Sequence, residues 1–530
     1  MEPSIIIRNG RIVDGTGCPW FKGDVGIEGD RIFGVGDLSE FKAEVEIEAR
    51  GLVVCPGFVD VHTHSDTSFL VNPRADSKIM QGVTTEIVGN CGNSAAPITD
   101  FGKTYYSNSN RYDAIDWDWT SVAEYYDRLE ANGLPLNVGT LIGHGTVRAS
   151  VMGYEARAPS TGELEQMKGL VEQGMRDGAF GLSSGLKYAP GCYAETDEVV
   201  ELCKVANKYG GIYATHLRNQ ALKVIEAAEE AIDIGRKTGI PVHIAHIKVR
   251  GRSVWGKGWN YLRIIEDARQ EGIDVTFDQY PYDKCGSSAS IPIWALEGGA
   301  ESLLNRLRDP VHRKKIESEI PEHEDWVGPE YTIIGKFAPN SKYEGKNLAD
   351  ISKLRNKTPE STVCDLVLES NGHVRLLMHF GWEEEIRNFM KHHLMMVGSD
   401  GSSITTKEMG KPHLRNYGTY PRFISKYVLG QGIISLEDGI RRATSFPARR
   451  FGLFDRGILR QNMIADLVLF NPKTITDIGT YMDPQKHPKG IEYVLVNGTI
   501  SVEKETFTGK LTGKTLKHKL LNSLARAKFM

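Results

Sequence analysis

The sequence predicts an α/β fold, in which a (β/α)8 barrel carries a small β-sandwich domain built from both ends of the chain. Eight short β-rich runs alternate with helix-period segments in the centre of the chain. Both ends instead contain β-rich runs separated by turn residues. A doubly wound sheet is the alternative architecture, but polar residues recur where so many central runs end, and this favours the barrel.

The β-rich runs at the two ends are alike. Residues 4–55 include SIIIRNGRIVDG and EVEIEARGLVVCPG, and residues 465–502 include ADLVLFNP and IEYVLVNGTISV. We therefore expect residues 1–56 and 455–530 to form one β domain, and residues 57–454 to form the barrel.

The eight central runs define the expected barrel strands. Helical stretches such as ELEQMKGLVEQGMRDG lie between consecutive runs, as the crossovers of a barrel require. The runs are FVDVH (58–62), TTEIVGN (84–90), LNVGTLIG (136–143), AFGLSSG (179–185), GIYATH (211–216), IPVHIAH (240–246), IDVTFDQYP (273–281) and LMMVGSD (394–400).

One segment interrupts this alternation. Residues 283–372 are too long for a simple loop and contain charged helical stretches, which predicts an inserted subdomain or lid over the strand ends. HVRLLMHF (373–380) is expected to form an additional strand before the last barrel strand.

Composition limits the class of function. The 530 residues carry 64 Lys+Arg and 68 Asp+Glu, a net charge of −4, which argues against nucleic acid or a membrane as partner. Seven scattered cysteines indicate a reduced, cytoplasmic protein. The N-terminus does not have the pattern of a signal peptide, and no window is apolar over the roughly 18 residues that a membrane span needs.

The first central run ends in two histidines. His62 and His64 are two residues apart, so on a strand both rings point to the same side and can reach one metal ion. A pair of hydrogen-bonded structural histidines explains the same spacing equally well.

Four further side chains decide between these readings. Cys91, His216, His246 and Asp400 each lie where another central run ends. The ends of barrel strands converge on one mouth, and imidazole, thiolate and carboxylate groups together suit Zn²⁺. The sequence therefore predicts a zinc site at the mouth.

Two other histidines lie near the runs. His243 is out of register with His246, so we expect it to pack on the opposite face. His144, just after the third run, is expected to support the site or contact substrate.

Longer motifs carry a family resemblance. GFVDVHTHSD, GVTTEIVGNCGNS, AFGLSSGLKYAPG, YATHLRN, HIAHIK, DQYPYD and MVGSDGSS, in this order, resemble the N-acyl-D-amino-acid deacylases (D-aminoacylases) of the amidohydrolase superfamily. RNGRIVDGTG near the start and ATSFPARRFGLFDRGILRQNMIADLVLFNP near the end also fit, so the resemblance covers nearly the whole chain. It implies a metal-dependent hydrolase barrel that cleaves N-acyl-D-amino acids, which are small molecules, to a carboxylate and a free D-amino acid.

The resemblance also assigns roles to residues. It implies that Cys91, His216 and His246 bind one zinc tightly, while His62 and His64 form a second, weaker position. Asp400 would be the catalytic acid/base. The residues expected to contact substrate are Tyr188, Lys248, Arg415, Ser287 (or Ser288) and His144.

Alternatives remain at this point. Many relatives in the superfamily bridge two metals with a carboxylated lysine at the end of strand four, where this chain reads SSG followed by Leu186 and Lys187. A cyclic amide hydrolase resembling hydantoinase or dihydroorotase is therefore the alternative enzyme. A non-catalytic scaffold is disfavoured because every expected ligand and the acid/base are present.

Overall fold

The central strands form a closed parallel barrel. The computed structural model describes residues 2–106, 115–251, 254–323, 326–404 and 410–519. Two parallel sheets, in the strand orders β6-β7-β8 and β17-β13-β12-β11-β10-β9, make up its wall. Thr63 and Gly401 form a parallel bridge, and the amide of Asp400 donates to the carbonyl of His62, so the chain after β17 closes the barrel against the end of β6.

Every predicted run overlaps a barrel strand, and β7 begins one residue before its run. Leu141 separates β8 from β9, so these two short strands together correspond to the third run. The strands are β6 (Phe58–Asp60), β7 (Val83–Val88), β8 (Asn137–Thr140) with β9 (Ile142–Gly143), β10 (Gly181–Gly185), β11 (Ile212–His216), β12 (Val242–Ile244), β13 (Val275–Gln279) and β17 (Met395–Val397). The predicted fold class is confirmed.

Helices surround the barrel. α6 (Thr161–Asp177) illustrates why they form: Ser160 and Glu163 make a reciprocal capping box at its start, and Gly178 ends it in the left-handed conformation. The other helices of the barrel layer are α1 (Ser68–Val71), α2 (Asp76–Ile79), α3 (Asp100–Tyr106), α4 (Val122–Asn132), α5 (His144–Met152), α7 (Thr196–Lys208), α8 (Val224–Thr238), α9 (Gly258–Gln270), α14 (Glu383–Lys391), α15 (Arg415–Arg422), α16 (Leu436–Ala443) and α17 (Ser445–Arg450).

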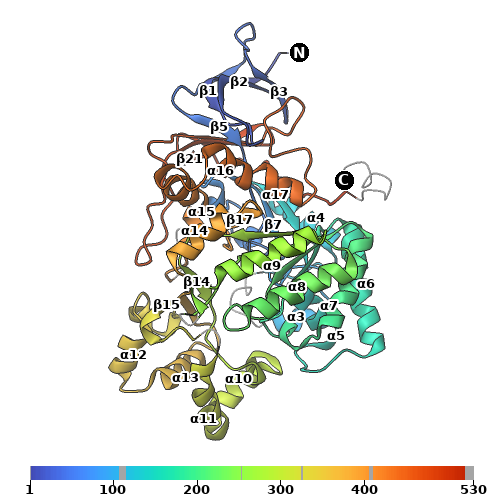
Figure 1. Cartoon of the computed structure of the whole chain (residues 1–530), viewed down its shortest axis with the longest axis vertical. Helices are drawn as coiled ribbons and strands as arrows, with labels where there is room; N and C mark the ends of the chain where they lie inside the picture. The colour runs from blue at the N-terminus through green and yellow to red at the C-terminus, as the bar shows by residue number, and fades with distance from the viewer. Residues whose placement is uncertain (1, 107–114, 252–253, 324–325, 405–409, 520–530) are drawn as a thin grey trace.

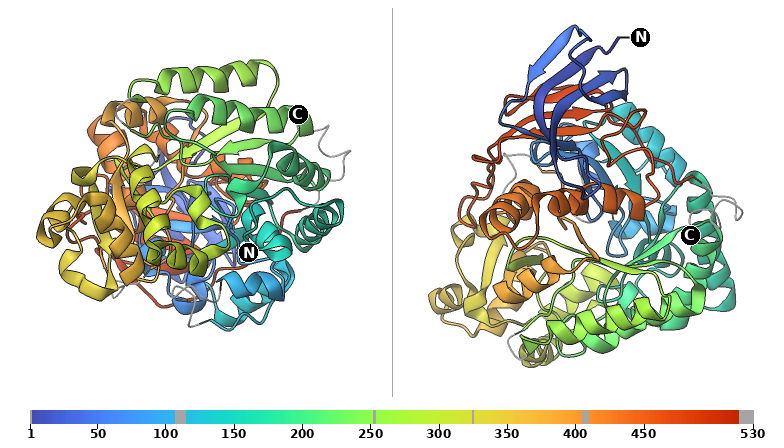
Figure 2. Two further views of the ribbon diagram at one scale, coloured as in Figure 1. Left: turned by 90° about the horizontal axis from the view of Figure 1, so that it is seen from below. Right: turned by 45° about the horizontal axis from the view of Figure 1, so that its top comes forward.

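The β domain joins both ends of the chain in one nine-stranded sheet. In the right panel of Figure 2, the N-terminal strands lie above the C-terminal ones at the top of the molecule. Its strand order is β21-β20-β19-β18-β5-β1-β2-β3, with β4 on β1. The strands are β1 (Ile5–Ile12), β2 (Phe21–Glu28), β3 (Arg31–Gly36), β4 (Val45–Glu48), β5 (Val53–Pro56), β18 (Leu467–Phe470), β19 (Ile491–Val496), β20 (Thr499–Glu503) and β21 (Thr506–Phe507).

The inserted segment has its own hydrophobic core, and it occupies the lower part of Figure 1. Seen from below, it lies in front of the barrel (Figure 2, left). HVRLLMHF forms β16, as predicted, between β14 and β15 of a small antiparallel sheet. The main elements are β14 (Lys284–Ser287), α10 (Gly299–Arg308), α11 (Pro310–Glu319), β15 (Thr332–Lys336), α12 (Leu348–Arg355), α13 (Pro359–Glu369) and β16 (Arg375–His379).

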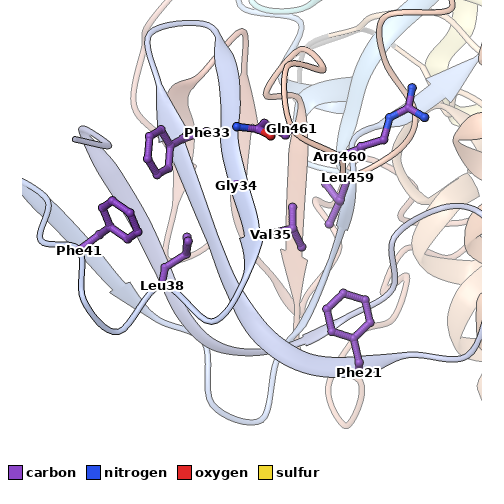
Figure 3. Close-up of a pocket in the computed structure, with 9 residues that line it drawn as sticks. All are labelled: Phe21, Phe33, Gly34, Val35, Leu38, Phe41, Leu459, Arg460 and Gln461. Carbon is purple, nitrogen blue, oxygen red and sulfur yellow. The ribbon is translucent and has the colours of Figure 1, made fainter. Parts of the chain in front are cut away.

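Membrane-spanning helices and surface hollows can both be signs of function. Within the described chain, no helix combines the length and apolar character needed to cross a membrane. A hollow of about 580 Å³ lies on the β domain, where Phe33, Leu38 and Phe41 face Leu459 and Arg460 (Figure 3). It lies outside the barrel mouth, where the predicted site residues meet.

Candidate active site

The predicted metal ligands converge on one buried sulfur. Cys91 Sγ lies 3.3 Å from His62 Nε2, 3.3 Å from His246 Nε2 and 3.6 Å from His216 Nδ1. All four side chains are buried. Four residues that are far apart in the sequence thus place potential metal-binding atoms at one point of the barrel mouth.

These separations fit zinc. A tetrahedral Zn²⁺ with sulfur at about 2.3 Å and imidazole nitrogen at about 2.0–2.1 Å places sulfur and nitrogen about 3.5 Å apart. The distances from Cys91 to His216 and His246 lie close to that value. The positions of Cys91, His216 and His246 are therefore compatible with one zinc ion, and His62, at 3.3 Å from Cys91, lies equally close.

His64 and Asp400 lie on the open side of this cluster. His64 Nε2 is 3.1 Å from Asp400 Oδ1, and His62 Nε2 is 3.7 Å from the same oxygen. The side chain of His64 is 24% exposed, whereas that of His62 is fully buried. His62, His64 and Cys91 also hold donor atoms within 4.8 Å of one another, which is the geometry of a second, more open position.

The backbone at three of these residues is strained. Cys91, His246 and Asp400 have φ values of +53°, +37° and +50°. The left-handed region is costly for residues with a Cβ, and such residues persist where the surrounding structure enforces them. Each of the three directly follows a barrel strand or lies just beyond its end, so the turn aims the side chain into the mouth.

Asp278 orients the ring of His62, a role that the sequence analysis missed. Its Oδ2 lies 3.0 Å from His62 Nδ1 and 2.9 Å from His243 Nε2. A carboxylate at Nδ1 holds the proton there and leaves Nε2 free to face Cys91. The sequence could have indicated this role, because Asp278 lies inside the apolar run IDVTFDQYP and a buried carboxylate needs hydrogen-bonding or charged partners. His243 is buried, but it does not lie on the face away from the site as predicted, because it shares Asp278 Oδ2 with the predicted ligand His62.

The electrostatics favour a bound cation. Burial would raise the pKa of the Cys91 thiol, but His246 and His62 outweigh it and hold that pKa well below its ordinary value. Burial lowers and Asp278 raises the pKa of His62, and the net pKa lies well above its ordinary value. The surroundings therefore favour the thiolate form of Cys91, which is the form that binds a metal ion.

Asp400 is kept ionised. Burial would raise the pKa of its carboxyl, but Arg415 and His246 hold that pKa well below its usual range. Arg415 Nη1 donates to Asp400 Oδ2 at 2.6 Å. A buried carboxylate facing the metal ligands is therefore available to accept a proton.

Comparison with known proteins identifies the family. An amidohydrolase family model matches residues 45–258. A D-aminoacylase of Alcaligenes xylosoxydans xylosoxydans is 33% identical over 516 residues, which cover 97% of each chain. The chain belongs to the N-acyl-D-amino-acid deacylase family.

Solved structures agree with this family. One concerns the binuclear metal centre of D-aminoacylase, with one-metal activation and second-metal attenuation; it has a TM-score of 0.84 and 31% identity, covering 97% of this chain and 99% of that one. An N-acyl-D-glutamate deacylase from Bordetella bronchiseptica, complexed with zinc and a phosphonate mimic of the tetrahedral intermediate, has a TM-score of 0.82 and 29% identity, covering 98% and 100%. A D-hydantoinase, at 18% identity and a TM-score of 0.57, shares the fold alone.

Two cations of this deacylase-family site flank an aromatic ring. Lys248 Nζ lies 3.2 Å from the hydroxyl of Tyr280, and the guanidinium of Arg415 lies 5.1 Å from the centre of its ring. Burial lowers the pKa of Lys248 to about 8. Tyr280 was not singled out from the sequence, although the quoted motif DQYPYD contains it.

Of the remaining residues predicted to contact substrate, the structure places Tyr188 at the mouth, Ser287 in the inserted segment and His144 beside Glu198. Tyr188 lies at the mouth, with its hydroxyl 3.4 Å from His216 Nδ1. Ser287 ends β14 in the inserted segment, opposite Leu376. His144 begins α5, where it is fully buried and its Nε2 lies 2.8 Å from Glu198 Oε1.

Proposed function

We propose that this protein hydrolyses the amide bond of N-acyl-D-amino acids in a zinc-dependent reaction, releasing a carboxylate and a free D-amino acid. One observation carries the proposal: the thiolate of Cys91 meets His216 and His246 at zinc-like distances, with the ionised Asp400 beside them. Family membership supports the same reaction, because relatives similar over the whole chain are named for it.

Cys91, His216 and His246 would hold the tightly bound zinc. All three are buried, and their donor atoms lie within 4.8 Å of one another. His62 and His64 would complete a weaker second position, because His64 is partly exposed and already bonded to Asp400. Zinc bound here would polarise the scissile carbonyl and lower the pKa of the attacking water.

Asp400 would act as the acid/base. Its Oδ1 faces His64 and the metal ligands, while Arg415 holds Oδ2. In this role the carboxylate accepts a proton from the attacking water and later donates it to the leaving nitrogen. The arrangement keeps one oxygen fixed and turns the other toward the reacting atoms.

Lys248, Arg415 and Tyr280 would bind the substrate carboxylate. Their charged and hydroxyl groups lie around one ring, next to the metal ligands. Charge-assisted hydrogen bonds to a carboxylate would fix the α-carbon and thereby the chirality that is accepted. Tyr188, at the edge of the mouth, would bound the same space.

The setting supports a small-molecule enzyme of a reducing compartment such as the cytoplasm. All seven cysteines are free. A cyclic amide hydrolase is the weaker alternative, since the hydantoinases share only the fold.

The decisive experiment is a paired assay of the zinc-loaded protein. N-acetyl-D-amino acids and their L-enantiomers would be compared at equal concentration with hydantoin and dihydroorotate. We expect release of the free D-amino acid with a D over L preference in kcat/KM. Ring opening without cleavage of linear substrates would instead establish the alternative, and a preference for L would contradict the proposed chirality.

A further inference from the structure

A second group of metal-binding side chains lies outside the candidate active site. His392 and His393 connect α14 to β17, and Glu266 lies in the last turns of α9. The two helices pack against each other (Figure 1). The three side chains place ligand atoms within 4.8 Å of one another.

This cluster lies at the opposite end of the barrel from the mouth. The histidines precede β17, whereas Asp400 follows it. Asp400 lies seven positions after His393 with β17 between them, so at about 3.3 Å per residue the two are up to roughly 20 Å apart. A cation bound here would not contact the substrate or the metal ligands at the mouth.

Both imidazoles approach the same carboxylate oxygen. His392 Nε2 lies 2.8 Å and His393 Nδ1 lies 3.6 Å from Glu266 Oε1. An ordinary ion pair needs only one imidazole, as in the exposed pair of His312 and Asp309. The second histidine at the same oxygen is what distinguishes the cluster from such a pair.

The charged groups around this cluster do not oppose the binding of a cation. Burial and the neighbouring His393 lower the pKa of His392, so its ring is neutral at neutral pH and has a lone pair to offer. Arg442 is a neighbouring cation: it donates to the carbonyl of His392 at 2.5 Å, and Asp438 balances its charge at 2.6 Å. The amide of Leu394 donates to His392 Nδ1 at 3.4 Å, which is long for a hydrogen bond. Losing this weak contact when the ring binds a metal ion would cost little free energy.

We propose that Glu266, His392 and His393 form a separate transition-metal site. Two imidazoles and a carboxylate are a borderline ligand set that suits Zn²⁺, Ni²⁺ or Cu²⁺. His393 is 65% exposed, so its ring can rotate toward an ion shared with His392, and water would fill the remaining positions. The proposal does not depend on the reaction proposed above.

Metal counting on the full-length, zinc-loaded protein tests the site. Wild type, His393→Ala and Glu266→Gln would be dialysed against micromolar Zn²⁺ at pH 7.5, and zinc per chain measured by plasma mass spectrometry. We expect each variant to hold one zinc fewer than wild type. Because His393 is largely exposed, its replacement should leave the thermal midpoint and kcat unchanged.

His312→Ala is the matched control. It removes an exposed histidine that also pairs with a carboxylate but has no second imidazole at that oxygen. We expect this variant to retain the wild-type zinc count. Equal counts in all four proteins would overturn the proposal, as would an equal loss in the His312→Ala control.

Discussion

At the scale of single residues, Asp400 shows how the site prepares a carboxylate. His64 approaches Oδ1 at 3.1 Å and Arg415 binds Oδ2 at 2.6 Å, so both oxygens are oriented before substrate arrives. The same contacts hold the pKa of the carboxyl well below its usual range, with Arg415 the larger influence. The residue therefore combines a fixed position with the charge that a proton acceptor needs.

Asp400→Asn should separate metal binding from catalysis. The amide keeps the size of the side chain but cannot accept the proton, so we expect kcat to fall by about 10²–10⁴-fold. Zinc content should stay at the wild-type value, because Cys91, His216 and His246 are untouched. Kinetics and plasma mass spectrometry on the same preparation provide the check, and wild-type kcat would place the acid/base elsewhere.

Lys248→Met should weaken binding of the substrate carboxylate. Losing one charge-assisted hydrogen bond costs about 1.5–3 kcal/mol, which corresponds to a rise in KM of roughly 10–100-fold. The N-acyl amino amide, which lacks the carboxylate, is the control substrate, and its KM should change little. If both substrates lost affinity equally, Lys248 would have a structural role only.

That the predicted metal ligands and the predicted acid/base would lie close together was the part of the site easiest to predict from the sequence. His62, His64, Cys91, His216, His246 and Asp400 all lie where parallel strands end, and such ends meet at one mouth. Asp278 and Tyr280 were missed because their roles depend on which neighbouring strand they face. His144 follows its strand directly, but α5 begins there and turns its ring toward Glu198.

At the scale of elements, a buried ion cluster joins two barrel strands to α2. Lys78 Nζ lies 3.0 Å from Asp60 Oδ2 and 3.5 Å from Glu86 Oε1, and none of the three side chains is exposed. Lys78 also donates to Ser399 Oγ at 2.6 Å, next to Asp400. Asp60 accepts the Ser399 amide at 2.9 Å, so this cluster fixes the strand ends that carry His62 and Asp400.

The two carboxylates of this cluster should differ in their importance. Asp60→Asn leaves the buried Lys78 without its closer partner and should lower the free energy of unfolding by about 3–5 kcal/mol. Burial, which outweighs Lys78, raises the pKa of Glu86, so its charge is already disfavoured and Glu86→Gln should cost far less. Chemical denaturation of both variants measures the difference, and equal losses would contradict this assignment.

Strand positions followed from the sequence more readily than strand lengths. The apolar runs located all eight strands, since each must be buried on both faces. The break at Leu141 and the three-residue length of β12 follow from how these segments pair with neighbouring strands, which the local sequence does not show. The lid function of the inserted segment stays a prediction, although its separate core and small sheet are observed.

At the scale of the whole molecule, a buried polar network ties the C-terminal half of the β domain to the barrel. Arg456 Nη1 binds Asp466 Oδ2 at 2.7 Å, and both side chains are almost fully buried. Asn137 of β8 donates to the same oxygen at 3.1 Å, and Asn497 donates from its side chain to Asn137 Oδ1 at 2.9 Å. Three distant parts of the chain thus share one network.

Arg456→Met should destabilise this junction. It leaves Asp466 buried without its cation, and we expect the free energy of unfolding to fall by about 3–5 kcal/mol. The double variant Arg456→Met with Asp466→Asn should recover part of this loss, because it removes the uncompensated charge. Denaturation curves of the three proteins decide the matter; a double variant less stable than Arg456→Met would refute the explanation.

The sequence indicated that both ends build one β domain, but not how their strands pair. β5 lies at the junction, parallel to β1 and antiparallel to β18, and this order depends on contacts more than 400 residues apart in the chain. The domain boundaries at 56 and 454 stay predictions, and residues 520–530 of the last segment lie outside the described chain.

The left-handed backbone at Cys91, His246 and Asp400 has a consequence for protein engineering. Glycine at any of these positions would relieve roughly 1–2 kcal/mol of steric cost. A library that places glycine here would therefore exchange a small backbone gain for the loss of a predicted zinc ligand or the acid/base, and at position 400 it would also leave the buried Arg415 without its carboxylate. Such libraries need a paired screen for turnover, or these three positions should be held constant.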